Sequence, residues 1–305
     1  MKTVLLLLAI LLLAHPLHAQ QMDSLQYARG YLYYHTYGTG TPVIILSGGP
    51  GNSYLQQEEV AIILGTSYKS ILLEQRGTGR SIPTPFDSTT ITLQAEVEDV
   101  KRLLDHLHIQ QGIIYGHSWG AMLAMCFAAA HPERVRTLVL ANPGYYKISE
   151  ENFAVHVANL RVRLGVADLQ LLDTLTKKMS DGRASAADSV ELDKLGRLSY
   201  IYNKSMLDSM LKKINAGKPN IKMRQLLIRD LFRVHYDVSK TLPRYKGPVH
   251  VIAGRQDALA FYTYDLKIIR PSIQLHWIQG SGHFPMFEQA KPFYDTLFTV
   301  LKTVR

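Results

Sequence analysis

Residues 113–123, IIYGHSWGAML, begin as a short apolar run suited to a buried strand and contain a serine held between two glycines. A segment of small residues with helical character follows. The arrangement is either an ordinary tight turn or the elbow that presents Ser118 as a nucleophile. An elbow needs Gly116 and Gly120, because side chains there would collide with the adjoining strand and helix. Partners for Ser118 elsewhere in the chain distinguish the two possibilities.

Two residues downstream have the spacing that such a serine requires. A serine hydroxyl becomes a nucleophile when a base takes its proton and a carboxylate orients that base. After an elbow the acid and then the histidine are expected, each in a loop beyond a later strand. The sequence VHVIAGRQDALA places Asp257 beyond one apolar run, and LHWIQGSGHFPMFEQ places His283 beyond the next. A helix-capping aspartate and a surface-loop histidine are the alternatives, and the joint placement favours a catalytic triad of Ser118, Asp257 and His283.

Backbone donors for an oxyanion hole are also present in the sequence. One N–H should come from the residue after the nucleophile, which is Trp119. The second is expected from a loop after an early strand, where ILSGGPGNS provides Gly48 and Gly49, with no side chains to obstruct a substrate carbonyl. A simple Gly-Pro turn is the alternative, but the loop follows the strand that the hydrolytic interpretation requires.

Short β-rich runs alternate with segments of helical period outside the middle of the chain. This alternation predicts an α/β fold, with a mostly parallel central sheet and helices on both faces. The expected strands are residues 31–38, 42–48, 69–75, 112–117, 136–143, 248–254 and 273–279, and the clearest expected helices are residues 93–109 and 292–304.

The alternation stops in the middle of the chain, where the sequence is helical in period and rich in leucine and lysine. We therefore expect a core domain of residues 20–144 and 247–305, interrupted by a helical cap insert of residues 145–246. The insert has 19 Lys and Arg against 11 Asp and Glu, which is +8 of the net charge of +9. No motif of a nucleic-acid-binding module accompanies this charge, so a solvated basic face is expected rather than a nucleic-acid partner.

The first residues have the layout of a secretory signal peptide. A single positive charge at Lys2 precedes an apolar run over residues 4–14 and a polar stretch that ends at Ala19. The run is short for a membrane span, which needs about 20 residues. An uncleaved anchor is the alternative. We expect residues 1–19 to be removed on export to the periplasm or beyond, with no stable membrane span afterwards.

The single cysteine and the spacing of the histidines indicate a fold stabilised by core packing, without disulfides or a structural metal. The only cysteine, Cys126, lies in a run of small apolar residues and is expected to be a buried packing residue. One cysteine permits no disulfide within the chain, and the scattered histidines show no zinc-site spacing. We expect neither a metal nor an organic cofactor. The oligomeric state does not follow from the sequence.

Five motifs together resemble the proline iminopeptidase group of serine α/β-hydrolases. They are SGGPG, EQRGTGRS, GHSWG, GRQD and GSGHFPMFE, and the resemblance covers residues 40–143 and 247–300 but is weak through the insert. It implies an α/β-hydrolase fold with the same triad and oxyanion donors at the positions assigned above.

Two positions depart from the pattern of that group. Ser47 stands where the group usually has histidine, and Glu74 stands where it usually has aspartate. Neither position supplies an atom of the triad, so hydrolytic chemistry is still expected. We interpret Glu74 and Arg76 as a structural ion pair or a brace for the loop rather than as catalytic groups.

The resemblance implies an exported aminopeptidase that releases N-terminal residues, proline foremost, from small peptides through an acyl-enzyme. Such an enzyme needs carboxylates for the free ammonium of its substrate, because a buried ammonium without partners is costly. The only cap glutamates are Glu150, Glu151 and Glu191, and solvated helix positions are the simpler interpretation of all three. A carboxylesterase or amidase acting on small molecules is the enzymatic alternative, and a ligand-binding protein on a hydrolase scaffold is the non-enzymatic one.

Overall fold

The computed structural model describes residues 20–304 of the chain. The signal peptide expected at residues 1–19 therefore lies outside the described residues. Within the described part of the chain, no helix is both long enough and apolar enough to cross a membrane.

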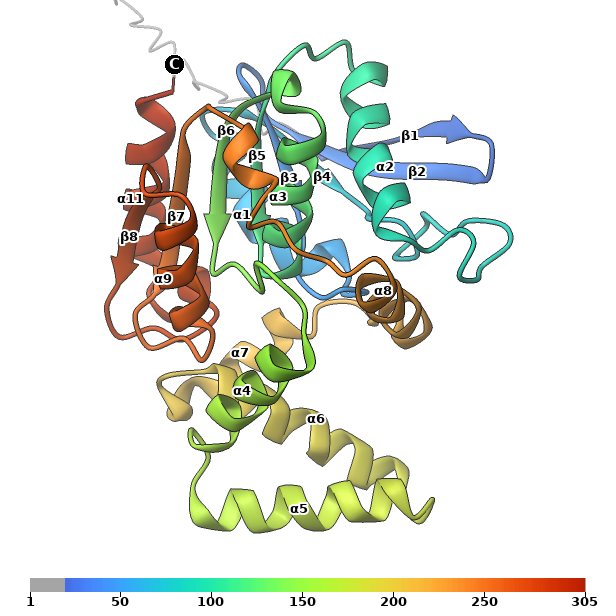
Figure 1. The fold of residues 1–305 in the computed structure, drawn as a ribbon, viewed down its shortest axis with the longest axis vertical. Helices are drawn as coiled ribbons and strands as arrows, with labels where there is room; N and C mark the ends of the chain where they lie inside the picture. Colours follow the sequence, from blue (N-terminus) through green and yellow to red (C-terminus); the bar gives the residue numbers. More distant parts are fainter. Residues whose placement is uncertain (1–19, 305) are drawn as a thin grey trace, which may run out of the picture.

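The core of the molecule is a sheet of eight strands in the order β1-β2-β4-β3-β5-β6-β7-β8 (Figure 1). The two pairings at one edge, β1 with β2 and β2 with β4, are antiparallel, and all others are parallel. The predicted sheet, mostly parallel, is confirmed. The strands are β1 (Gln21–Tyr27), β2 (Gly30–Tyr37), β3 (Pro42–Leu46), β4 (Lys69–Leu73), β5 (Gly112–His117), β6 (Val135–Ala141), β7 (Val249–Gly254) and β8 (Gln274–Ile278).

Helices cover both faces of this sheet. The helices of the core are α1 (Glu58–Gly65), α2 (Leu93–His106), α3 (Trp119–Ala130), α9 (Ala260–Ile269), α10 (Pro285–Glu288) and α11 (Ala290–Lys302). Apolar side chains of α2 and α3 pack in one core cluster, and those of α1 and α11 pack in the other. The strand β5 contributes to both clusters, with Ile114 in the first and Ile113 and Tyr115 in the second. Burial on both faces explains why the central strands are continuous apolar runs.

Five α-helices lie between β6 and β7, in the segment expected to form the cap. They are α4 (Glu150–Arg161), α5 (Val166–Ser180), α6 (Ala186–Tyr200), α7 (Leu207–Ile214) and α8 (Ile221–Arg233). Figure 1 shows α5 and α6 projecting away from the sheet, whereas α8 lies close to it. Met223, Leu227 and Leu231 of α8 belong to the first core cluster, so the end of this segment packs as part of the core.

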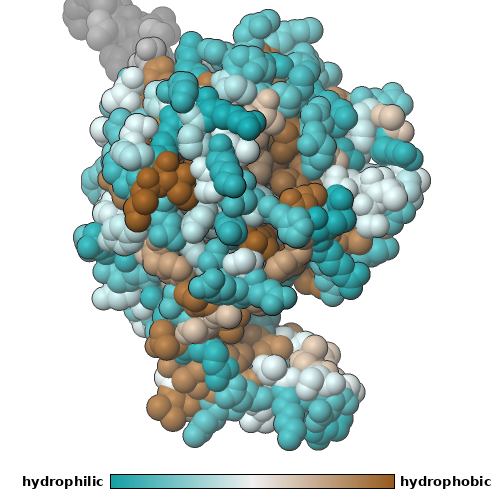
Figure 2. Space-filling view, viewed as in Figure 1, coloured by the Kyte–Doolittle hydropathy of each residue, from teal (hydrophilic) through white to brown (hydrophobic). Residues whose placement is uncertain are grey.

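Apolar side chains are exposed on α4, on α5 and in the turn that joins them. Phe153 and Val157 of α4, Val162 in the turn that follows, and Val166 and Leu171 of α5 are all exposed. Figure 2 shows hydrophobic residues gathered over this part of the molecule.

Candidate active site

Ser118 lies in a strained turn between β5 and α3. Its backbone has φ 54° and ψ −113°, a conformation that costs energy for a residue with a side chain. A Cβ added to Gly116 would lie 2.2 Å from the carbonyl oxygen of Gly120, and one added to Gly120 would lie 2.2 Å from that of Leu46. Both glycines are therefore required by close backbone approach, which is the property expected of an elbow rather than of an ordinary turn.

The structure brings the three predicted triad residues together. His283 Nε2 lies 2.9 Å from Ser118 Oγ, and His283 Nδ1 lies 2.8 Å from Asp257 Oδ2. The arrangement requires the tautomer with its proton on Nδ1, so that the serine hydroxyl donates to Nε2. Asp257 follows β7 and His283 follows β8, at the carboxyl ends of adjacent parallel strands.

Three donors hold Asp257 in its ionised form. Burial raises the pKa of Asp257, but the facing His283, the Asn142 side chain and the Leu259 N–H together outweigh it, so the pKa lies below its usual 3.8. Asn142 Nδ2 donates to Asp257 Oδ2 at 2.7 Å, and the N–H of Leu259 donates to Oδ1 at 3.1 Å. A carboxylate that accepts several hydrogen bonds stays charged, and can stabilise a positive imidazole.

The predicted oxyanion donors lie around the serine. Trp119 is the first residue of α3, where a helix leaves its N–H groups without intrahelical partners. Gly48 and Gly49 line the same cavity as Ser118. A Cβ on Gly48 would lie 2.9 Å from Gln56 Oε1 and 3.0 Å from His117 Nδ1, so a side chain at that position would displace these neighbours of the serine.

His117, the neighbour of the serine, is a buried neutral histidine. Burial, together with the nearby His283, lowers the pKa of His117 to about 3. Its Nε2–H donates to the carbonyl oxygen of His283 at 2.9 Å. His117 thereby braces the loop that carries the predicted base.

Ser118 lines two neighbouring hollows. The larger, of about 500 Å³, is lined by Ser118 and His283 together with polar side chains of the loop after β3, of α6 and of α8. The smaller, of about 170 Å³, is mostly apolar and is lined by Met122, Phe153 and Phe232 among others. Small-molecule sites combine apolar walls with a few polar groups in this way.

Several lining residues were not foreseen from the sequence. Asp193, Arg197 and Tyr200 of α6 and Arg224 of α8 line the larger hollow. No local motif marks them, because a helical insert places its side chains through tertiary packing. Glu150, Glu151 and Glu191, the cap glutamates considered for an ammonium, are not among the residues that line either hollow.

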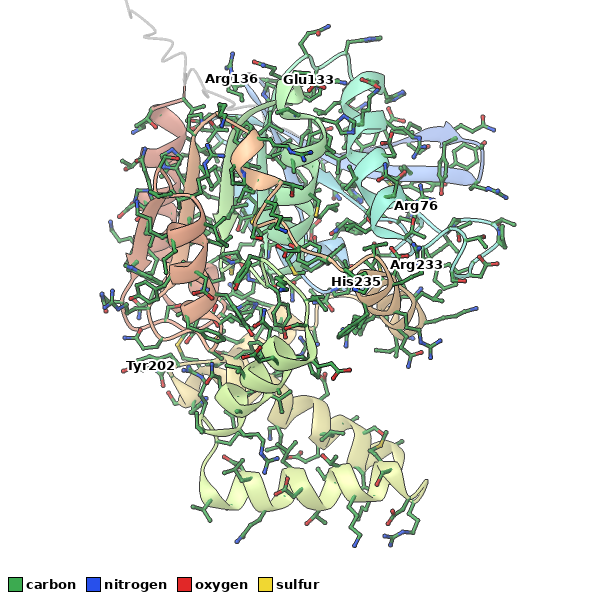
Figure 3. All side chains as sticks on the ribbon, viewed as in Figure 1. Arg76, Glu133, Arg136, Tyr202, Arg233 and His235 are labelled. Carbon is green, nitrogen blue, oxygen red and sulfur yellow. The ribbon has the colours of Figure 1, made fainter. Side chains whose placement is uncertain are left out.

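Glu74 and Arg76 do not pair with each other, so of the two structural roles expected for them the ion pair is wrong and the brace for the loop agrees with the structure. Glu74 Oε1 lies 2.7 Å from His35 Nε2, and its Oε2 accepts the N–H of Arg80. Arg76, labelled in Figure 3, turns to α2 and donates from Nε to Asp99 Oδ2 at 2.8 Å. Each side chain instead anchors the loop after β4 to a different neighbouring element.

Among residues 20–304, no group of three or more His, Cys, Asp or Glu side chains is arranged to hold a metal ion. Cys126 is partly exposed on α3, and burial of its sulfur raises the pKa of the thiol to about 12. A thiol with so high a pKa is a poor nucleophile at neutral pH.

Comparison with known proteins identifies the family of the chain. A profile described as "alpha/beta hydrolase fold" matches residues 41–290. The cis-3-alkyl-4-alkyloxetan-2-one decarboxylase of Shewanella oneidensis is 24% identical over 269 residues, which cover 83% of this chain and 79% of that protein. The proline iminopeptidase of Neisseria gonorrhoeae is 39% identical, but over only 103 residues, about a third of each chain. A structure of a carboxylesterase from Nitrososphaera gargenis covers 92% of this chain and 98% of its own, with a TM-score of 0.67 and 23% identity.

Proposed function

This chain belongs to the alpha/beta hydrolase fold family, and we propose that it is a serine hydrolase that cleaves small carboxylic esters or amides through an acyl-enzyme. The observation that carries the proposal is the continuous set of contacts from Ser118 through His283 to Asp257. A base and an orienting acid at hydrogen-bond distance are what a serine needs to attack a carbonyl carbon.

The proposed reaction uses each group in turn. Ser118 Oγ attacks the carbonyl carbon while its proton passes to His283 Nε2, and Asp257 stabilises the imidazolium that forms. The N–H groups of Trp119 and of the Gly48-Gly49 turn would stabilise the oxyanion. The imidazolium then protonates the departing alcohol or amine. A water molecule, deprotonated by His283, releases the acid and restores the serine.

The two hollows support a small substrate with an apolar part. The smaller hollow would hold a short aliphatic or aromatic group beside Ser118, and the larger would hold the more polar half. Ester or amide hydrolysis of small molecules is therefore our first candidate.

Cleavage of an N-terminal residue from a short peptide is the second candidate. Its support is the partial similarity to proline iminopeptidases and the presence of one carboxylate, Asp193, among the described residues lining the larger hollow. Asp193 lies 3.5 Å from Arg197, however, so a substrate ammonium would compete with that guanidinium. This competition places the aminopeptidase second.

We also propose that the enzyme acts outside the cytoplasm. The proposal is supported only by the sequence of residues 1–19, whose charged start, apolar run and small residues before position 20 suit cleavage by a signal peptidase.

One set of assays separates the two substrate classes. Prolyl 4-nitroanilide, its N-acetyl derivative and 4-nitrophenyl butyrate are compared with wild-type protein and with Ser118→Ala. Cleavage of the ester that is lost in Ser118→Ala supports the first candidate. Cleavage of the unblocked prolyl compound alone would replace it with the second. Hydrolysis that survives Ser118→Ala would overturn both.

A further inference from the structure

The charged side chains that line the larger hollow include more cations than anions. Among the described residues, Arg197 and Arg224 are the cations that line it, and Asp193 is the one carboxylate. Arg197 comes from α6 and Arg224 from α8, so two separate elements direct guanidinium groups to one space beside Ser118 and His283.

The charge of Arg224 has no acidic partner. Its Nε donates to the carbonyl oxygen of Pro50 at 3.1 Å, and its Nη2 donates to Asn52 Oδ1 at 3.0 Å. Both acceptors are neutral. Within residues 20–304, no carboxylate forms an ion pair with Arg224. Burial and the neighbouring Arg197 lower the pKa of Arg224 more than the charge of Asp193 and the nearby Tyr200 raise it, which agrees with a cation that is only partly compensated.

Arg197 is only partly compensated. Its Nε is buried without a hydrogen bond and lies 3.5 Å from Asp193 Oδ1. The Asp193 side chain is 51% exposed, and its other oxygen faces Asn215 Nδ2 at 3.4 Å. The Asp193 carboxylate is therefore also open to solvent and to Asn215. Two guanidinium groups face this single carboxylate, so this part of the hollow has a net positive charge.

We propose that Arg224, assisted by Arg197, binds a carboxylate of the substrate while Ser118 attacks an ester or amide elsewhere in the same molecule. A half-buried cation without a partner is costly, and an anionic ligand removes that cost. The fixed donors of guanidinium match a carboxylate well. The substrate class is then a small carboxylic ester or amide that carries a second, free carboxylate, and this inference rests on the proposed hydrolase function.

Two pairs of esters test the charge preference. 4-Nitrophenyl hydrogen adipate is compared with its neutral analogue 4-nitrophenyl adipamate, and 4-acetoxybenzoate is compared with 4-acetoxybenzamide. The first pair carries the charge on the acyl side of the scissile bond, and the second carries it on the leaving group. We expect at least one anionic ester to have a kcat/KM about 10- to 100-fold above its neutral analogue, mainly through a lower KM.

The arginine variants connect this preference to the proposed site. Arg224→Gln should abolish the preference, since the charge-assisted bond forms only with the anionic ester, whereas loss of the bonds to Pro50 and Asn52 affects both esters of a pair equally. Arg197→Gln should reduce the preference less, because Arg197 already faces Asp193. Arg229→Gln removes the same charge from an exposed position of the same helix and should leave kcat/KM unchanged for both esters of each pair. Equal rates for both pairs in the wild type, or an equal loss on both esters of a pair in Arg224→Gln, would overturn the proposal.

A binding measurement separates failure of this inference from failure of the hydrolase proposal. Adipate, which has no bond to cleave, is titrated calorimetrically into Ser118→Ala and into Ser118→Ala combined with Arg224→Gln. Binding to the first protein alone supports the anion site even if no ester is hydrolysed. Ester hydrolysis that depends on Ser118, with no adipate binding and no charge preference, would overturn the anion site and keep the hydrolase.

Discussion

Asn142 Nδ2 donates a hydrogen bond of 2.7 Å to Asp257 Oδ2, the same oxygen that lies 2.8 Å from His283 Nδ1. Asn142 follows β6 and Asp257 follows β7, so the contact joins the ends of two adjacent strands. Asn142 also has a positive φ of 42°, which asparagine tolerates better than most residues. The aspartate is thus held by a neighbour that the sequence motifs did not identify.

Replacing the carboxylate should nearly abolish turnover. In Asp257→Asn the residue facing Nδ1 can no longer stabilise a positive imidazole or select the reactive tautomer. We expect kcat on an aryl ester to fall by about 10³- to 10⁴-fold. Asp265→Asn, a partly buried aspartate of α9 that lines neither hollow, should retain wild-type kcat. A similar loss in both variants would contradict a specific role for Asp257.

Removing the Asn142 side chain should lower kcat as Asp257→Asn does, but by a smaller factor. Asn142→Gly keeps the positive φ and deletes the hydrogen bond to the charged Asp257, typically worth about 1.5 to 3 kcal/mol, together with the bonds to Gly282 O and from Gly254 N–H. We expect kcat to fall about 10-fold or more with KM nearly unchanged, because the aspartate is less firmly placed. Steady-state kinetics with the same aryl ester measure both quantities. A change in KM alone would show that Asn142 does not act through the triad.

The elbow glycine and a cap glycine should respond oppositely to alanine. In Gly120→Ala the new methyl group would meet the carbonyl oxygens of Leu46 at 2.2 Å and of Ser47 at 2.7 Å. We expect the free energy of unfolding to fall by more than about 4 kcal/mol, or no folded protein at all. Gly196 of α6 has no atom within 4 Å of an added Cβ, so Gly196→Ala should stabilise by about 0.5 to 1 kcal/mol. Chemical denaturation measures both, and a stable Gly120→Ala protein would contradict the packing described for the elbow.

The buried His117 should make the protein sensitive to mild acid. Its pKa is lowered from 6.5 to about 3 on folding, so between these values the unfolded chain binds one more proton than the folded chain. Stability therefore falls as the pH drops through this range, by up to about 1.4 kcal/mol per pH unit from this residue.

A histidine variant tests this contribution. His117→Asn should lose less stability than the wild type between pH 7 and pH 5. His235→Asn replaces an exposed histidine, labelled in Figure 3, and is the matched control that should follow the wild type. Urea denaturation at several pH values gives the free energy of unfolding, and its slope against pH is compared between the variants. Equal slopes for wild type and His117→Asn would contradict the assignment.

The expected export gives a prediction about the mature chain. Expressed in full in a Gram-negative host, the protein should be recovered from the periplasm or the medium with Gln20 as its first residue. Mass spectrometry of the intact protein checks the cleavage site. Recovery of the full-length chain from the cytoplasm would contradict it.

The elements predicted well are those whose pattern is local. The buried strands β3 and β5 and the amphipathic α2 follow from apolar periodicity, and the glycines around Ser118 mark the turn between β5 and α3. The edge strand β1 was missed, because its residues are mostly exposed and it is stabilised mainly by pairing with β2. Arg197, Arg224 and Asn142 were missed for a related reason. Their roles arise from contacts between residues far apart in the sequence, which no short motif records.

Covalent labelling of Ser118 tests the central claim most directly. The folded protein is treated with an alkyl fluorophosphonate, and the modified residue is located by peptide mass spectrometry in wild type, Ser118→Ala and His283→Ala. The account predicts one adduct on Ser118 in the wild type, none in Ser118→Ala, and labelling slowed by orders of magnitude in His283→Ala. An unlabelled wild-type protein, or an adduct that forms equally fast without His283, would show that Ser118 is not an activated nucleophile.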